Sequence, residues 1–509
     1  MSNMELQSFP EPIPPDGAIT ESIDAPRISR SRALFIIISV TGITFLNTIG
    51  QGLLLAAIPR IAIDLNIPET LIQWPTAMFS LTLGCTLLIA GAVADAIGNR
   101  PVFLIGCAFH LAFMVGCALI KTGAQLLAFR AFQGVALSLC MPASVGIITT
   151  TFPSGMTRNI AFACFSGGNP IGYGLGLLLG GIFVDTLGWR WCYYLGLCLN
   201  GLILITSFFS IPLAQPSGGI SWSRLRSSVD WVGAIIASVV LALLSYVLAV
   251  ISSSSSNIRN PINIIILCLA IILIPCFIFW VGRQEARQSP AIIPNSLWRK
   301  IEFSSVCAAT FLTWAMFNSF GFFVTLTLQK IQHVSAFQTS LRFLPLMIMS
   351  ILANVVAGYL VGKVPAGILA TATSLLSAAA PLLFATMSPR WSYWLAAFPA
   401  MAVSPISSDF LFNISNLVIT AAFPSGEQAV AGGVFSTVSQ LGNSIGLALT
   451  AVIASSVMST ERHGAVEEDE NILRGYKGAF WASFGAAIGT CLISAWGLRK
   501  VGKVGLKRE

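Results

Sequence analysis

The sequence predicts an all-α protein that crosses a membrane many times, built as two six-helix repeats with two inserted helices. Of the 509 residues, 55% are hydrophobic and only 9% are charged, whereas a soluble domain carries roughly 25% charged residues. Apolar runs of about 20 residues, the length that crosses a bilayer as a helix, recur along most of the chain. This composition excludes an ordinary soluble enzyme, an intrinsically disordered chain and a disulfide-stabilised scaffold.

About fourteen apolar runs are long enough to span a bilayer, and each predicts one transmembrane helix. Residues 1–32 precede them and are polar and rich in proline, so we expect a disordered cytosolic tail there. The late start of the first run excludes a cleaved signal peptide. The runs cover 34–58, 71–94, 102–120, 124–150, 159–184, 191–213, 230–251, 262–282, 304–329, 340–362, 366–387, 391–422, 428–458 and 476–498.

Lysine and arginine gather in alternate loops and at the C-terminus, for example at Arg283, Arg287 and Arg299. By the positive-inside rule, this distribution predicts that both termini are cytosolic. The net charge of +8 therefore reflects topology, and we expect no nucleic-acid partner. The 11 cysteines lie in apolar runs without a CxxC pair, so neither a metal site nor a disulfide is predicted.

A short internal repeat indicates two related halves. The fifth run contains Gly-Asn-Pro-Ile-Gly at 168–172, and the thirteenth contains Gly-Asn-Ser-Ile-Gly at 442–446. Parallel repeats of this kind occur in secondary transporters. We therefore expect a six-helix repeat over 33–213, a linker with two inserted spans over 214–300, a second six-helix repeat over 301–498 and a basic cytosolic tail over 499–509.

Polar residues inside the runs recur at helical spacing, which places them on single helix faces. Polar groups within a bilayer need water or one another, so we expect these faces to line a common substrate cavity. The alternative is hydrogen bonding that ties neighbouring helices together. The predicted cavity residues are Asn47, Gln51, Gln133, Asn169, Tyr173, Trp314, Asn318, Asn413, Asn416 and Gln440.

Asp409 is the only one of the 20 acidic residues that lies well inside an apolar run. A charge at that depth costs roughly 2.5–3.5 kcal/mol, and a carboxyl group removed from water favours its protonated form. Asp409 is therefore the predicted proton carrier, with a static salt bridge or a permanently neutral acid as the alternative. Arg130 keeps its charge. It is predicted to balance the charge of the cavity, with a structural tie to backbone carbonyls as the alternative.

Glycines mark two further candidate elements. The loop that contains Gly91, Asp95, Gly98 and Arg100 is predicted to act as a conformational latch, because Asp95 can pair with Arg100 or cap a neighbouring helix. A plain tight turn is the alternative. Glycines in the fifth run allow close helix contact, either as a sliding interface between the repeats or as simple packing. They are Gly172, Gly176, Gly180 and Gly181.

Three of these segments resemble motifs of the major facilitator superfamily. The Gly91–Arg100 loop resembles the signature between its second and third helices. Arg130-Ala-Phe-Gln133-Gly134 resembles its fourth-helix motif, and Gly172–Gly181 resembles the fifth-helix antiporter motif of exporters. Residues 33–500 as a whole resemble the fungal drug:proton antiporter family with fourteen spans. The segments 158–163 and 188–191 resemble its aminotriazole-resistance and ammonium/boron-transporter-like branch.

The resemblance implies a transporter without enzymatic activity, an alternating-access fold and proton-coupled efflux of drugs, toxins or fungal secondary metabolites. Many members carry an aspartate where this chain has Asn47, which puts more weight on Asp409. The proton gradient supplies the energy, and no cofactor is expected. Two alternatives remain open at this point. One is uptake of a small nutrient or inorganic species such as ammonium or borate, and the other, more remote, is a non-transporting receptor or scaffold.

We further expect a monomer whose partners are the small-molecule substrate, protons and the lipid bilayer. The plasma membrane is the predicted location, with the vacuolar membrane as the alternative.

Overall fold

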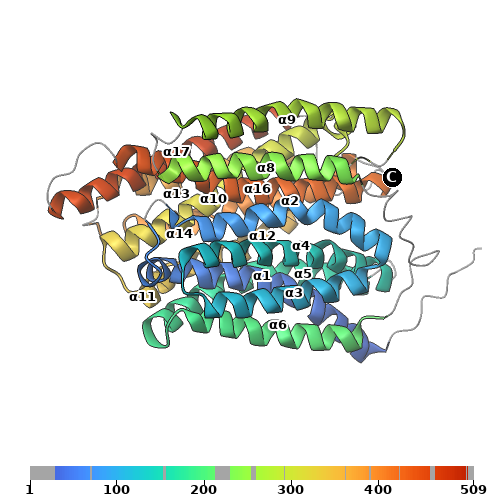
Figure 1. Ribbon diagram of the computed structural model, residues 1–509, viewed down its shortest axis with the longest axis horizontal. Helices are drawn as coiled ribbons and strands as arrows, with labels where there is room; N and C mark the ends of the chain where they lie inside the picture. Colours follow the sequence, from blue (N-terminus) through green and yellow to red (C-terminus); the bar gives the residue numbers. More distant parts are fainter. Residues whose placement is uncertain are drawn as a thin grey trace, which may run out of the picture.

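The computed structural model is built of helices, and no strand occurs among the residues that it describes (Figure 1). This confirms the predicted all-α class. The described residues are 29–68, 71–152, 156–212, 230–253, 259–289, 291, 293–361, 363–388, 391–422, 425–458, 465–499 and 501.

The first half of the chain forms a bundle in which α1 packs against α5 and α6, while α4 packs against α2 and α3. Gly98 joins α2 directly to α3 with a φ of 110°, a backbone conformation that favours glycine. The predicted tight turn at Gly98 is therefore present. The six helices are α1 (Arg30–Asp64), α2 (Trp74–Ile97), α3 (Asn99–Leu119), α4 (Gly123–Thr151), α5 (Met156–Thr186) and α6 (Arg190–Ser210).

Two helices lie between the halves in sequence. α8 (Trp231–Ser253) packs against α2 of the first half and α16 of the second half. α9 (Pro261–Ala286) packs on α8, and its exposed side chains, such as Ile264, Ile265 and Phe279, form an apolar surface suited to lipid. The short 3₁₀ helix η3 (Asn295–Arg299) then leads into the second half.

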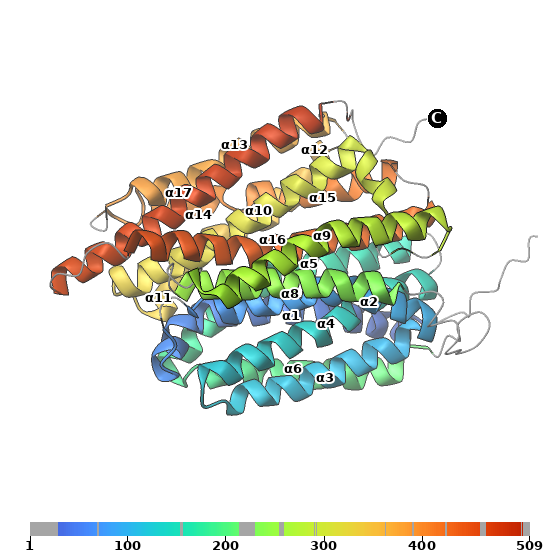
Figure 2. The ribbon, with the colours of Figure 1, turned by 45° about the horizontal axis from the view of Figure 1, so that its top comes forward.

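The second half forms the other bundle (Figure 2). Here α10 packs against α15, α16 and α17, and α13 packs against α17. Its elements are α10 (Ile301–Leu326), the π-helical turn η4 (Thr327–Ile331), α11 (Ala336–Arg342), α12 (Leu344–Leu360), α13 (Ala366–Thr386), α14 (Ala397–Val403), α15 (Ile406–Ala422), α16 (Ser425–Met458) and α17 (Ala465–Gly497).

Two predicted runs are divided into shorter helices. The run 340–362 is divided at Phe343, before Pro345, into α11 and α12, and the run 391–422 contains α14 and α15 separated by Ser404 and Pro405. Proline has no backbone N–H and clashes with the preceding turn, so helices end or restart there.

Within the described residues, 12 helices are long and apolar enough to cross a membrane. The chain is therefore an integral membrane protein. The remaining predicted spans correspond to α8, of which Trp231–Leu244 is a shorter apolar helix, and to the divided segment α14–α15. Fourteen crossings accordingly remain a prediction.

The halves meet at α2 and α5 of the first half. α2 packs against α16, and α5 packs against α11 and α12. The candidate functional residues are distributed on both sides of this seam.

Candidate functional site

The polar residues of α1 make contacts both within the helix and with α5. Gln51 Nε2 donates a hydrogen bond to Asn47 Oδ1 at 3.1 Å, and Asn47 is buried. Thr48 faces α5 instead, because its hydroxyl donates to the Gly168 carbonyl at 3.4 Å. Asn47 and Gln51 therefore pair with each other, whereas Thr48 ties α1 to α5, and a shared cavity for these residues stays a prediction.

Aromatic rings connect the two halves near the middle of the helices. The Tyr173 ring on α5 lies 6.4 Å from the Phe317 ring on α10. Trp314 approaches the same Phe317 edge-on, at 5.9 Å between centroids. The predicted residues Tyr173 and Trp314 are thus brought together by Phe317, which was not predicted. Asn169 lies one turn before Tyr173 on α5 and is half-buried.

Arg130 is held inside the first half. Its Nε donates to the Pro75 carbonyl on α2 at 3.1 Å, and one terminal nitrogen donates to Gln133 Oε1 at 2.9 Å. The guanidinium lies 4.2 Å from the centre of the Phe79 ring, within the range of a cation–π interaction. The predicted backbone tie is therefore present, and Gln133 shares the Arg130 site.

Two buried donors at this site have no partner among the described residues. They are the second terminal nitrogen of Arg130 and Gln133 Nε2. The two side chains are 4% and 1% exposed, so each free N–H is withdrawn from bulk water. An unpaired buried donor costs about 1–3 kcal/mol, so this pair is suited to hold water or an acceptor group.

Asp409 lies in the first turn of α15, because the chain breaks at Pro405 just before it. Ser350 and Asn354 on α12 lie beside its carboxyl group. One carboxylate oxygen, Oδ2, is buried without a partner among the described residues. Asn413 donates to Asn354 Oδ1 at 3.0 Å, which completes a polar cluster of three amide or carboxyl side chains and one hydroxyl.

This surrounding gives Asp409 two opposed influences. Removal from water favours the neutral acid, while the start of a helix and nearby donors favour the carboxylate. Ser350 and Asn354 were not predicted, although their four-residue spacing in the run 340–362 was an available signal.

A further amide cluster lies on the second half at the seam. Asn318 on α10 donates to the Asn443 carbonyl on α16 at 3.3 Å, and Asn443 donates to Gln440 at 3.4 Å. Gln440 packs against Gly84 of α2, where an added Cβ would lie 2.9 Å from the Gln440 Cβ. Asn318 and Gln440 are therefore brought together, and Gln440 faces the first half.

The predicted cavity residues thus form several clusters. No ion pair or hydrogen bond joins Arg130 to Asp409 in the described part of the chain, and a common polar path through all clusters remains a prediction. The Asn416 side chain lies outside the described residues.

The segment predicted as a latch loop is helical except at Gly98, because α2 extends to Ile97 and α3 begins at Asn99, and no ion pair closes it among the described residues. Asp95 is exposed, and it does not pair with Arg100 within the described residues. Arg100 donates to the Phe208 carbonyl of its own half at 2.7 Å and lies 5.7 Å from the Phe208 ring centre. Gly91 packs against Pro142, also of the first half.

The glycines of α5 face two different neighbours. Gly172, Gly176 and Gly180 approach the α1 backbone, where a Cβ on Gly176 would lie 2.9 Å from the Ile49 Cα. Gly181 instead faces the second half, where its Cβ would lie 2.8 Å from the Phe337 Cα. The predicted interface between repeats therefore applies to Gly181, and the other three glycines pack within the first half.

Comparisons with known proteins agree with this fold. The model of the Major Facilitator Superfamily matches residues 40–447. "MFS-type transporter 1" of Pyricularia oryzae is 40% identical, over 94% of this chain and 85% of that protein. The "Major facilitator superfamily multidrug transporter mfsC" of Aspergillus fumigatus is 27% identical, over 91% and 87%.

Among solved structures, a bacterial homologue of the human lysosomal transporter Spinster, in an inward-facing and unoccupied conformation, superposes with a TM-score of 0.66. It is 16% identical, with 93% of this chain and 98% of that chain covered. At this identity the similarity concerns the fold alone.

Proposed function

The chain belongs to the Major Facilitator Superfamily of membrane transporters, and on that premise we propose that it exports small organic molecules in exchange for protons. The proposal rests on Asp409. It is an acid set in a polar cluster on α15 and α12, with one buried oxygen unpartnered among the described residues. Export in exchange for protons requires such a group, which takes up a proton on one side of the membrane and releases it on the other.

The substrate class follows from the side chains near the seam. Tyr173, Trp314 and Phe317 offer aromatic surface, while Asn47, Gln51 and Asn318 offer both donors and acceptors. This combination suits lipophilic molecules with a few polar groups. The name of the mfsC relative, a multidrug transporter, supports the same class. We further propose that the chain belongs to the aminotriazole-resistance branch of the fourteen-span antiporter family. We also propose that both termini are cytosolic and that the protein lies in the plasma membrane.

The test measures transport of an aromatic dye by the purified protein in liposomes with an imposed pH gradient. The dye is one that cells expressing the protein exclude. Asp409→Asn keeps the shape of the side chain and removes its titration. We expect it to abolish gradient-driven transport, while dye binding to the detergent-solubilised protein stays within about twofold of wild type. Glu302→Gln, an acid in the first turn of α10, is the matched control and should transport normally.

Three outcomes contradict the proposal. Wild-type gradient-driven transport by Asp409→Asn would remove Asp409 from proton coupling. Cells that lack the protein should also accumulate more dye than wild-type cells. Lower accumulation would instead indicate uptake, and an unchanged level for every compound tested would favour a receptor or scaffold.

A further inference from the structure

Hydrogen bonds join the two halves at the end of the molecule opposite the chain termini. The backbone N–H of Phe337, in the first turn of α11, donates to Asp185 Oδ2 near the end of α5 at 2.9 Å. Gln329 in η4 donates to the Ala56 carbonyl of α1 at 3.2 Å. In Figure 1, α11 lies at the left end of the bundle and the C-terminus at the right. Each bond connects a residue of the first half to one of the second.

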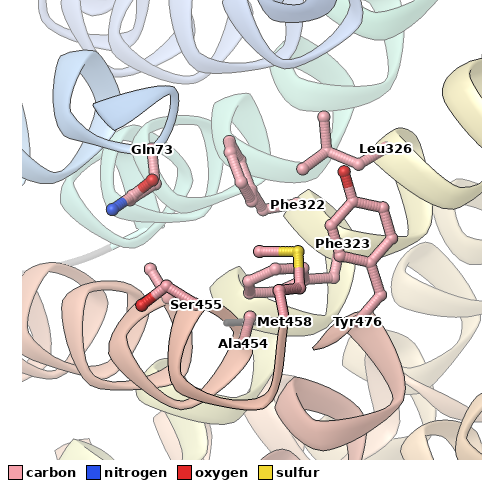
Figure 3. Close-up of a pocket in the computed structure, with 9 residues that line it drawn as sticks. Gln73, Phe322, Phe323, Leu326, Ala454, Ser455, Met458 and Tyr476 are labelled. Carbon is pink, nitrogen blue, oxygen red and sulfur yellow. The ribbon is translucent and has the colours of Figure 1, made fainter. Parts of the chain in front are cut away.

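Close packing accompanies these bonds. Gly181, one turn before Asp185, leaves room for Ser340 and Phe337 of α11, and Gly174 leaves room for Met347 of α12. Near the start of α2, Gln73 of the first half faces Phe322, Phe323 and Met458 of the second half (Figure 3). The void enclosed there is about 20 Å³, which is space for about one water molecule. This end of the seam is therefore closed.

The end that carries the termini shows a different arrangement at the predicted latch. Asp95 is exposed, and Arg100 bonds to Phe208 within its own half. Neither residue forms a hydrogen bond or ion pair with the second half among the described residues. The structure therefore combines a bonded seam at one end with an unengaged latch loop at the other.

From this arrangement we infer that Asp185 is a positioning residue that latches the end opposite the termini. A carboxylate that accepts from a backbone N–H in the first turn of a helix forms a charge-assisted bond that the helix dipole strengthens. Asp185 and Phe337 belong to different halves, so this bond breaks whenever that end opens. The latch thus favours one of the two access states, whatever the substrate and its coupling ion are.

The test compares hydrogen exchange at both ends in the full chain, reconstituted in lipid nanodiscs. Asp185→Asn removes the charge, and Phe337→Pro removes the donor at a first-turn position where proline is tolerated. Asp185 is exposed, and a solvent-exposed carboxylate at a helix start shifts a two-state equilibrium by about two- to fivefold. We therefore expect exchange in 336–342 to rise by about that factor, while exchange in 91–100 falls as the opposite end closes.

The control is Thr186→Val, because among the described residues the Thr186 hydroxyl bonds to Ile182 of its own helix alone. It should leave both segments unchanged. Faster exchange in 336–342 without slower exchange in 91–100 would show that Asp185 only caps α11, and the inference would be wrong. Unchanged exchange in both variants would overturn it as well. Neither readout requires transport, so failure of the proton-coupling proposal would leave the result interpretable.

Discussion

Arg130 and Asp409 lie in opposite halves of the molecule, and each keeps a buried polar atom without a partner among the described residues. Arg130 is otherwise bonded to Pro75 and Gln133, and Ser350 and Asn354 lie beside Asp409. A protein interior rarely leaves such groups unpaired without a reason. Water or substrate reaching these atoms would therefore contact one fixed positive charge and one titratable acid.

Arg130→Lys tests how much the planar guanidinium contributes. Lysine keeps the charge, but it cannot donate to Pro75 and Gln133 in the same fork or stack equally on Phe79. We expect the free energy of unfolding to fall by about 1.5–3 kcal/mol and transport to fall severalfold, measured by thermal unfolding in detergent and by dye efflux. Arg60→Lys is the control, since its exposed ion pair with Asp64 is worth less than about 1 kcal/mol. Full transport by Arg130→Ala would show that the side chain is only structural.

At the scale of elements, α5 packs both against its own half and against the other half. Gly172, Gly176 and Gly180 fix it to α1 of its own half, while Gly181 faces α11 of the other half. A sequence pattern of glycines cannot distinguish these faces, because it specifies close approach without naming the neighbour.

Gly176→Ala should weaken the contact between α5 and α1. The added Cβ would lie 2.9 Å from the Ile49 Cα, so the helices must separate, at a cost of about 1–3 kcal/mol. The melting temperature in detergent should fall accordingly. Gly201→Ala on α6 is the matched control, because nothing lies within 4 Å of its added Cβ, and alanine should stabilise the helix by about 0.5–1 kcal/mol. Equal melting temperatures for the two variants would contradict this account of α5.

The apolar runs predicted the helices because burial in a bilayer requires long apolar segments with internally paired backbones. They did not predict the divisions at Phe343 and Pro405, although Pro345 and Pro405 were visible signals. These divisions matter for the site. One places Asp409 in a first turn, and the other leaves α11 as a separate short helix whose start meets Asp185. The partners of Asp409 and Asp185 depend on contacts between distant segments, which a single sequence does not encode directly.

At the scale of the whole molecule, the latch proposed at Asp185 implies that this structure is one of two access states. Its seam is bonded through Asp185 at the end opposite the termini, and Asp95 at the other end is exposed. Alternating access requires the reverse combination in the second state. In that state, the sequence predicts a role for Asp95, either paired with Arg100 or capping a neighbouring helix.

Two latches at opposite ends should act against each other, and a double variant tests this. Asp185→Asn should favour the state in which the end that carries the chain termini is closed. Asp95→Asn should favour the state described here. The 24 residues of α2 span about 36 Å, so Asp95 is distant from Asp185 near the other end of the bundle. Effects of distant sites add. The double variant should therefore regain near-wild-type exchange in both 91–100 and 336–342. If it exchanged like Asp185→Asn alone, Asp95 would stabilise neither state, and the loop from Gly91 to Arg100 would be a tight turn without a latch function.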